Sequence, residues 1–147
     1  MNEREIKNIR ENPLIGEVYL VNFAGGGSTQ RGLRPAVIFQ NNTGNRYSPN
    51  VIVLPLTSSI KKTRQDTHVF IPASGTGLRR DSMVLCENPV CIPKSSLGNY
   101  LTSIPEEYMS KIAVASLLAS SAVAYISVAD VEAIMKRAEE LNAMICA

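Results

Sequence analysis

The feature that most limits the possible folds of this 147-residue chain is the order of its hydrophobic patterns. Short runs rich in valine and isoleucine follow one another from Gly16, separated by clusters of glycine, asparagine, serine and proline, which is typical of β-strands. No helical pattern of ten residues interrupts them before Ser103. Alternating β-α units are therefore excluded, and a small, strongly bent antiparallel sheet or barrel is predicted. The expected strands are EVYLVNF, RPAVIFQN, NVIVLPLT, HVFIP and SMVLCEN.

Helical patterns gather at the C-terminal end. The motif SIPE, residues 103–106, indicates a capping box with Pro105 in the first turn, and predicts a helix that continues to about Tyr125. A second box, SVAD at residues 127–130, predicts an amphipathic terminal helix. We expect this helix to pack on the barrel or on the preceding helix, or to extend a dimer interface. Its apolar residues are Val131, Ile134, Met135, Ala138, Leu141 and Ile145. EREIKNIREN, residues 3–12, suggests a short leading helix.

Length and composition indicate one globular domain, with 45% apolar residues, 19% charged residues and a net charge of +2. The three cysteines, Cys86, Cys91 and Cys146, form no Cys-x-x-Cys motif, and the N-terminus lacks the apolar core of a signal peptide. We therefore expect a cytoplasmic protein with reduced thiols. Residues 112–129 carry no charge but are diluted by alanine and serine, so a buried helix is expected there rather than a membrane span.

Several kinds of catalytic site are disfavoured by the residues present. His68 is the only histidine, which leaves no histidine pair for acid–base catalysis and no His-rich metal site within one chain. The sequence has no Gly-x-Ser-x-Gly motif. The glycine-rich residues 24–32 lack the Walker and dinucleotide-binding spacings, so they predict a mobile loop. His68 is expected to be a residue at the edge of a strand.

Polar and basic residues gather at the ends of two predicted strands. Pro35 suits the start of a strand because it has no N–H to donate, but this does not explain the preceding Arg34. An arginine held at a strand end beside a loop is well placed to bind an anion. Thr57 ends the strand NVIVLPLT. If the two strands are neighbours joined by residues 41–50, their ends meet in a basic, hydroxyl-lined cleft suited to a phosphodiester.

Four sequence blocks together resemble the MazF/PemK toxin endoribonucleases: GEVY at residues 16–19, QRGLRP at 30–35, VLPLTS at 53–58 and GLRRDS at 77–82. The resemblance covers roughly residues 14–125 in the right order. It implies a mainly β fold with α-helices: a small SH3-like antiparallel β-barrel of the CcdB/MazF type with C-terminal helices. On this basis residues 1–147 form a single toxin domain, with a helical extension from about residue 127.

The same resemblance implies an activity and partners. It implies metal-independent, cofactor-free cleavage of single-stranded mRNA at short sequences by a homodimer that has no membrane association. It also implies an acidic antitoxin that occupies the RNA groove and forms a DNA-binding complex with the toxin. The glycine-rich loop differs from the acidic or bulky residues of many relatives, and this leaves the recognised bases open. The tail from about Ser127 lies beyond the usual end of the family.

In this family the arginine before the proline and the threonine after the third strand carry catalysis, and these positions match Arg34 and Thr57. We expect Arg34 to stabilise negative charge and Thr57 to orient a phosphate oxygen while the RNA 2′-hydroxyl attacks; the general base is left open. The candidate RNA-binding residues are Ser28, Thr29, Gln30, Arg31, Ser58, Ser59, Lys61, Lys62, Arg64 and Arg79.

Two alternatives remain at this point. One is a gyrase-poisoning toxin of the CcdB type, which binds a protein and cleaves nothing. The other is a catalytically inactive relative that binds RNA or a protein partner. The arginine and threonine blocks argue against the first.

Overall fold

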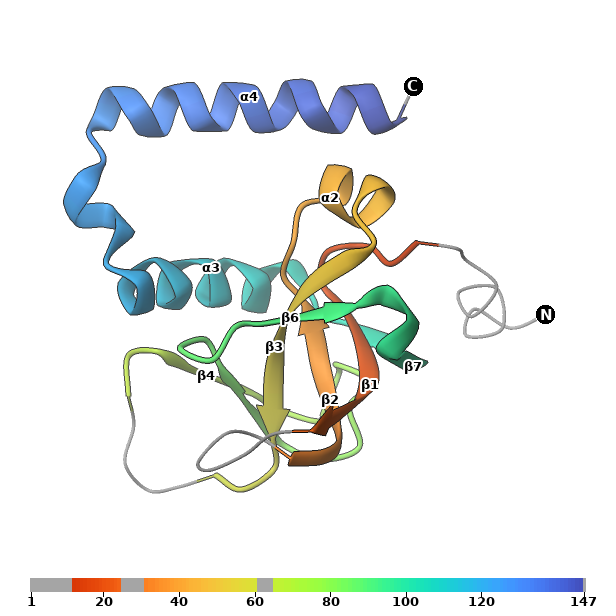
Figure 1. Cartoon of the computed structure of the whole chain (residues 1–147). Coiled ribbons are helices and arrows are strands. Elements are labelled where there is room, and N and C mark those ends of the chain that lie inside the picture. The colour runs from red at the N-terminus through yellow and green to blue at the C-terminus, as the bar shows by residue number, and fades with distance from the viewer. Residues whose placement is uncertain (1–11, 25–30, 61–64, 147) are drawn as a thin grey trace.

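The structure is a computed structural model that describes residues 12–24, 31–60 and 65–146. Within these residues, seven antiparallel strands form one strongly bent sheet, followed by two long helices (Figure 1). The strands are β1 (Glu17–Ala24), β2 (Arg31–Ile38), β3 (Asn50–Thr57), β4 (His68–Ile71), β5 (Ser82–Leu85), β6 (Val90–Pro93) and β7 (Leu97–Ser103). The helices are α2 (Asn42–Tyr47), α3 (Glu106–Ser120) and α4 (Val128–Cys146), with short 3-10 turns η1 (Lys94–Ser96) and η2 (Ala122–Tyr125).

The central strand β3 makes the sheet bend. The strand order is β4-β5-β3-β2-β1-β7, and β6 also pairs with β3. The first half of β3 pairs with β6, from Asn50 to Val53, whereas Leu56 and Thr57 at its end pair with β5. Because β3 changes partner along its length, the sheet folds over on itself. The five expected strands are present, and their antiparallel arrangement is confirmed; β6 and β7 were not predicted.

Both faces of the bent sheet are buried. Val18 and Val37 belong to one apolar cluster, and their chain neighbours Tyr19 and Ala36 belong to the other. This alternation follows from the two-residue period of a strand. Helix α3 covers the first cluster with Ile112, which is fully buried. Because both faces are buried, strands such as β5 are apolar or small at successive positions and do not alternate between apolar and polar residues.

The capping box predicted at residues 103–106 is wrong. Helix α3 begins at Glu106 with Pro105 as its N-cap, and no side chain caps it. Ser103 belongs instead to β7, where it pairs with Glu17, and its Oγ lies 3.0 Å from Oη of Tyr100. The helix also ends earlier than predicted, at Ser120, followed by the left-handed Ser121 and η2.

The second predicted capping box is confirmed. The N–H of Asp130 donates to Oγ of Ser127 at 3.1 Å, and the N–H of Ser127 donates to Oδ2 of Asp130 at 2.8 Å. Both bonds favour the charged carboxylate, which lowers the pKa of Asp130. These reciprocal bonds satisfy two backbone donors at the start of α4.

The expected packing of the terminal helix is not seen within the chain. Helix α4 runs back over α3 and makes its main contact with α2, while Val131 and Ile134 stay exposed (Figure 1). The expected leading helix falls almost wholly on residues 1–11, outside the described residues. None of the helices in the described ranges has the length and apolar character that a bilayer crossing requires.

Cys86 should resist alkylation while the protein is folded. It belongs to the first core cluster, and burial raises the pKa of its thiol to about 11. Iodoacetamide at pH 8 should therefore modify the exposed Cys91 readily and Cys86 only after unfolding, as measured by peptide mass spectrometry. Folding raises this pKa above its ordinary value of 9.0, so the thiol's contribution to stability is intact below pH 9 and is lost as the pH rises toward 11. Equal native-state labelling of both thiols would contradict this.

Candidate active site

Arg34 and Thr57 lie at the same end of the sheet. Strands β2 and β3 are antiparallel neighbours in which Ala36 pairs with Pro55 and Ile38 with Val53. The same register, continued two residues beyond Ala36, brings Arg34 level with Thr57. The expectation that the two strand ends meet is therefore confirmed.

Arg34 does not start its strand, contrary to the sequence-based expectation. Strand β2 begins at Arg31, and Arg34 pairs with Val21 of β1. The register with β1 extends to the beginning of β2, whereas the ladder with β3 covers only Ala36 to Ile38. Arg34 is thus held by β1 on one side and lies just beyond the last residues paired with β3 on the other. Its side chain is half-buried.

A cavity of about 730 Å³ opens at this end of the sheet. Arg34 lines it together with Arg79 and Arg80, which come from the loop between β4 and β5. No aspartate or glutamate is among the described residues that line it. Guanidinium groups stay protonated at any physiological pH, so the cavity is permanently cationic. Its remaining polar side chains are those of Ser58, Ser82, Asn99 and Tyr100.

Thr57 lies beside this cavity and does not line it. Its side chain is half-buried, and its Oγ1 accepts a hydrogen bond of 3.1 Å from the N–H of Ser59. This bond fixes the turn after β3 and leaves the hydroxyl proton able to donate elsewhere. The next residue, Ser58, lines the cavity.

The loop that carries Arg79 and Arg80 is tied to the rest of the fold. The hydroxyl of the buried Thr76 donates to the carbonyl of Pro72 at 2.5 Å, and Oγ1 of Thr102 in β7 donates to the carbonyl of Thr76 at 2.8 Å. Gly77 follows with φ of +77°, and a Cβ there would lie 2.5 Å from Oγ1 of Thr102. The arginines are therefore presented by a loop with little freedom to move, as preorganised charge stabilisation requires.

The structure brings together only part of the predicted set. Ser58 and Arg79 line the cavity, and Ser59 is exposed next to it. Arg31 begins β2, but its side chain is not described. Ser28, Thr29, Gln30, Lys61, Lys62 and Arg64 lie outside the described residues.

Four polar lining residues were not predicted from the sequence. Arg80 and Ser82 belong to the GLRRDS block, so the block itself contained the signal for them. Asn99 and Tyr100 lie on β7. Because no strand was expected there, nothing in the sequence pointed to their place beside Arg34.

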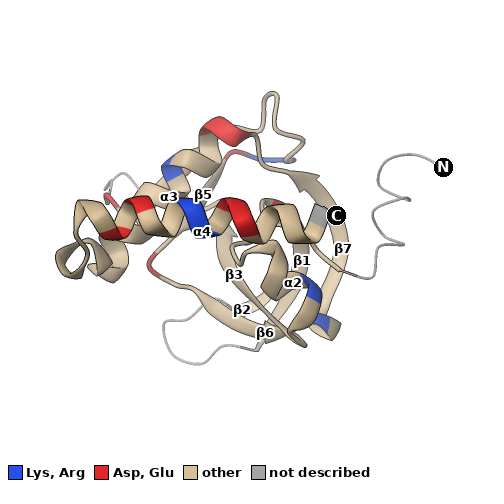
Figure 2. Cartoon of the chain, turned by 90° about the horizontal axis from the view of Figure 1, so that it is seen from above, with Lys and Arg blue, Asp and Glu red and all other residues tan. Residues whose placement is uncertain are grey.

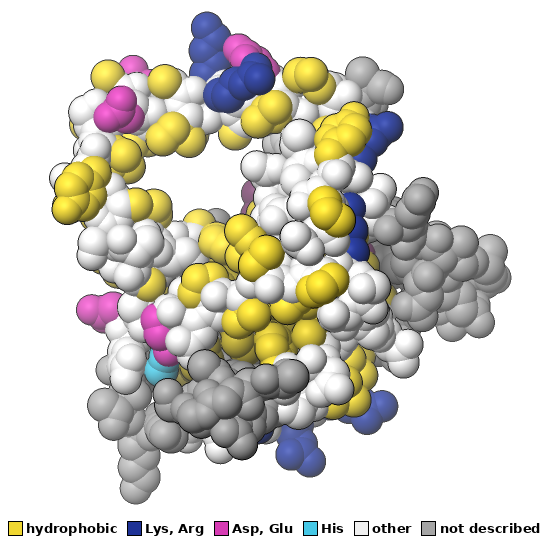
Figure 3. Space-filling model, viewed as in Figure 1, with side chains coloured by type: hydrophobic (Ala, Val, Ile, Leu, Met, Phe, Trp, Pro, Cys, Tyr) yellow, Lys and Arg dark blue, Asp and Glu magenta, His cyan; other side chains and the backbone are white. Residues whose placement is uncertain are grey.

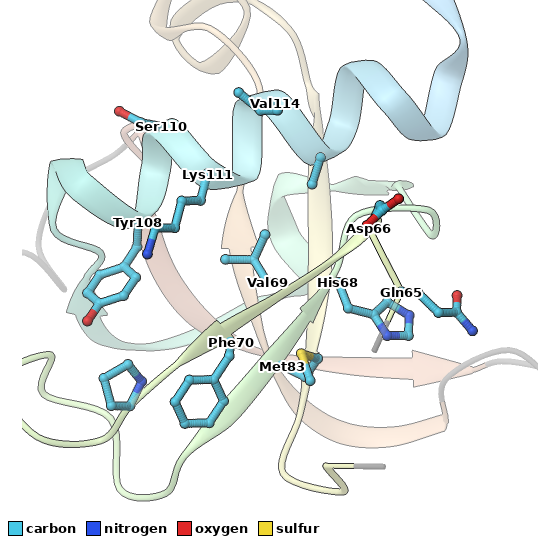
Figure 4. Close-up of a pocket in the computed structure, with 12 residues that line it drawn as sticks. Gln65, Asp66, His68, Val69, Phe70, Met83, Tyr108, Ser110, Lys111 and Val114 are labelled. Carbon is cyan, nitrogen blue, oxygen red and sulfur yellow. The ribbon is translucent and has the colours of Figure 1, made fainter. Parts of the chain in front are cut away.

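The single histidine lies in a different place. His68 begins β4, an end strand of the sheet as described, and its Nε2 lies 2.7 Å from Oε1 of Glu87. It borders a second cavity of about 760 Å³ between β4 and α3, where Lys111 lies over the ring of Tyr108 (Figure 4). This cavity shares no lining residue with the arginine-lined one. Within the described ranges, no three His, Cys, Asp or Glu side chains are grouped so as to hold a metal ion.

The fold and cavity define a class of protein: proteins with a bent antiparallel sheet, a helix after the last strand that covers one of its faces, and a cationic cavity at a strand end. Residues 15–118 match the family described as PemK-like, MazF-like toxins of type II toxin–antitoxin systems. The chain belongs to this family. The predicted family and fold class are thereby confirmed.

Two relatives illustrate the sequence similarity. Endoribonuclease EndoA of Bacillus subtilis is 40% identical over 98 residues, which cover 66% of this chain and 84% of the relative. Endoribonuclease MazF of Staphylococcus saprophyticus is 42% identical over 98 residues, which cover 66% of this chain and 82% of the relative.

Solved structures share the fold. A mycobacterial endoribonuclease in complex with its cognate antitoxin superposes with a TM-score of 0.63 at 28% identity, covering 74% of this chain and 95% of that one. MazF from Deinococcus radiodurans gives a TM-score of 0.64 at 22% identity, covering 74% of this chain and 96% of that one. Because the family match ends at residue 118, α4 lies wholly beyond it.

Proposed function

We propose that this protein is the toxin of a type II toxin–antitoxin system and that it cleaves single-stranded RNA. One observation carries the proposal: Arg34, Arg79 and Arg80 line one cavity with no acidic side chain among its described lining residues, at the strand end level with Thr57. Such a cavity suits a phosphodiester anion. The family match and the relatives named endoribonucleases support the same activity.

The proposed reaction uses the RNA's own 2′-hydroxyl. The 2′-oxygen gives up its proton to a base and forms a bond to the adjacent phosphorus, while the bond from phosphorus to the 5′-oxygen breaks. The departing 5′-oxygen takes up a proton, which leaves a cyclic phosphate and a free 5′-hydroxyl. Arg34 stabilises the charge that develops on the phosphate oxygens. A guanidinium does not release its proton near neutral pH, so this role is assigned to Arg34 and the general base is left unassigned.

Thr57 contributes an oriented hydroxyl. Because its Oγ1 accepts from the N–H of Ser59, its own proton takes no part in that bond and is able to donate to a phosphate oxygen. Arg79, Arg80 and Ser58 hold the neighbouring backbone. Lys61, Lys62 and Arg64, which follow Ile60 in the sequence, add cationic charge. A single strand is the expected substrate because its unstacked bases are accessible to loops.

The partners are proposed on the same grounds. An acidic antitoxin segment suits the cationic cavity and competes there with RNA; a solved relative in complex with its cognate antitoxin supports such a partner. We also propose that the protein is a homodimer located in the cytoplasm.

The direct test is incubation of the purified protein with a long single-stranded RNA, with and without a chelator. The expected result is cleavage at short sequences in both conditions, with cyclic phosphate and 5′-hydroxyl ends. RNA binding without cleavage would indicate the inactive relative. Neither binding nor cleavage, with inhibition of gyrase, would indicate the CcdB-type alternative.

Replacing Thr57 with valine should slow cleavage by about 10²-fold, because the isosteric side chain keeps the β-branched shape and removes the hydroxyl donor. Thr57→Ser keeps that hydroxyl and should stay within about tenfold of the wild-type rate. Single-turnover cleavage of a short RNA measures both. Equal rates for the valine and serine variants would remove Thr57 from the reaction.

A further inference from the structure

Helix α4 carries an uninterrupted apolar stripe, which we call the α4 seam. It consists of Val131, Ile134, Ala138, Leu141 and Ile145, at successive spacings of three, four, three and four residues. This spacing keeps side chains on one face of a helix and is typical of helices that pack against other helices. None of the six charged residues of α4, whose positions along the ribbon are coloured red and blue in Figure 2, belongs to the seam.

The N-terminal part of the seam has little to pack on within its own chain, whereas Leu141 and Ile145 are half-buried in a helix that contacts α2. Ile134 is 56% exposed and Val131 is 40% exposed. The outer face of α3 is equally uncovered: Val114, Leu117 and Leu118 project from it and are all exposed. Figure 3 shows an opening between α3 and α4 with hydrophobic side chains along its rim. Apolar surfaces of this extent on a soluble protein usually mark an interaction site.

We propose that a second copy of this chain fills this gap, with the α4 seam of each copy docked on the outer face of α3 of the other. The inference rests on the homodimer included in the proposed function, and it assigns a role to a helix that the family match does not reach. Exchange of an identical element between two copies is a common way to form a dimer.

The dimensions of the two surfaces favour a second copy. Helix α3 has 15 residues and α4 has 19, so they are about 22 and 28 Å long and can lie along one another. Within a symmetric dimer the contact occurs twice, so all four exposed helix faces are covered together. Each copy then contributes the five residues of the seam and the three outer residues of α3, which together form an apolar core of the kind that a polar rim surrounds in a protein interface.

The distribution of charged residues on the two helices also favours a second copy of this chain as the partner. From Ile112 to Ser120, α3 carries no charged residue, and the seam carries none either, so their contact leaves no ion buried without a partner. An acidic antitoxin segment would instead meet a helix with four carboxylates and two cations. These residues are Asp130, Glu132, Glu139 and Glu140, with Lys136 and Arg137.

A matched pair of variants of the full-length protein tests the proposal. Ala138→Glu places a carboxylate in the seam, and Ala143→Glu places the same group five residues on, which is about 140° away around the helix. Both alanines are exposed in the single chain, so neither change should unfold it. The dimer dissociation constant is measured by sedimentation equilibrium, and circular dichroism verifies the helix content of each variant.

We expect Ala138→Glu to raise the dimer dissociation constant by at least about 10²-fold, because it buries a carboxylate without a partner. Ala143→Glu should leave the constant within about threefold of the wild-type value. The proposal is overturned if wild-type protein is monomeric at micromolar concentration, if both variants weaken the dimer equally, or if neither does. RNA cleavage by the wild-type protein is measured separately. If the protein dimerises through this contact but cleaves no RNA, the proposed activity is refuted and the proposed interface stands.

Discussion

Replacing Arg34 with alanine should reduce the rate of RNA cleavage by about 10³-fold, the upper range for the loss of one preorganised donor at a developing charge. The reason is positional. Arg34 is held by its pairing with β1 and lines the cavity with Arg79 and Arg80. RNA binding should fall much less, since those two arginines still attract the backbone. Single-turnover rates and equilibrium binding of the same RNA separate the two effects.

Two further variants sharpen this expectation. Arg34→Lys keeps the charge and loses the planar fork that can bind two phosphate oxygens, so a loss of about 10²-fold is expected. Arg46→Ala is the matched control, because Arg46 is an exposed arginine of α2 at the opposite end of the β2–β3 hairpin. It should cleave at the wild-type rate. Wild-type cleavage by Arg34→Ala would end the catalytic assignment, and loss of folding would make Arg34 a structural residue.

Replacing Gly77 with alanine should lower the free energy of unfolding by about 2–4 kcal/mol. Two effects add. The residue has φ of +77°, which costs an L-residue roughly 1–2 kcal/mol, and the new Cβ would lie 2.5 Å from Oγ1 of Thr102. Urea denaturation measures the change. Cleavage should also fall, because the loop that carries Arg79 and Arg80 must shift to relieve the contact.

Gly75→Ala separates these two effects. Gly75 has a nearly identical φ of +76°, but a Cβ there meets no atom within 4 Å. Its replacement should therefore cost only the backbone part, about 1–2 kcal/mol. Removing the hydroxyl with Thr102→Ala in the Gly77→Ala protein should recover part of the remaining difference. If Gly75→Ala and Gly77→Ala prove equally destabilising, the close contact with Thr102 contributes nothing to the loss of unfolding free energy.

Local patterns were sufficient for the five valine- and isoleucine-rich strands and insufficient for β7. That strand, LGNYLTS, contains a glycine and an asparagine that normally indicate a loop. In the fold, Gly98 is required for a different reason: a Cβ there would lie 2.8 Å from the carbonyl oxygen of Leu20, so only glycine allows β7 to approach β1. The same long-range pairing places Ser103 in the ladder and prevents it from capping α3.

For the candidate site too, the sequence was sufficient for the residues placed by local structure and insufficient for those placed by long-range strand pairing. Arg34 and Thr57 could be placed together because one hairpin joins their strands, and a hairpin is local in sequence. Asn99 and Tyr100 reach the cavity through the pairing of β7 with β1, in which Tyr19 pairs with Tyr100 far along the chain. The helical period of α4 correctly predicted a helix with one apolar face. A period cannot say which surface covers that face.

The floor of the arginine-lined cavity constrains how this protein can change its substrate. Tyr100 lines the cavity, yet it is only 6% exposed and packs edge-on against Tyr19 of the second core cluster, with ring centroids 5.8 Å apart. Leu56 likewise lines the cavity and belongs to the first core cluster. In the proposed function, a change of base preference therefore involves two kinds of position. Exposed rim residues such as Arg79 and Ser58 can vary at little cost to folding, whereas every floor substitution is also a core substitution. Divergence of specificity is thus directed to the loops, and the floor keeps its shape.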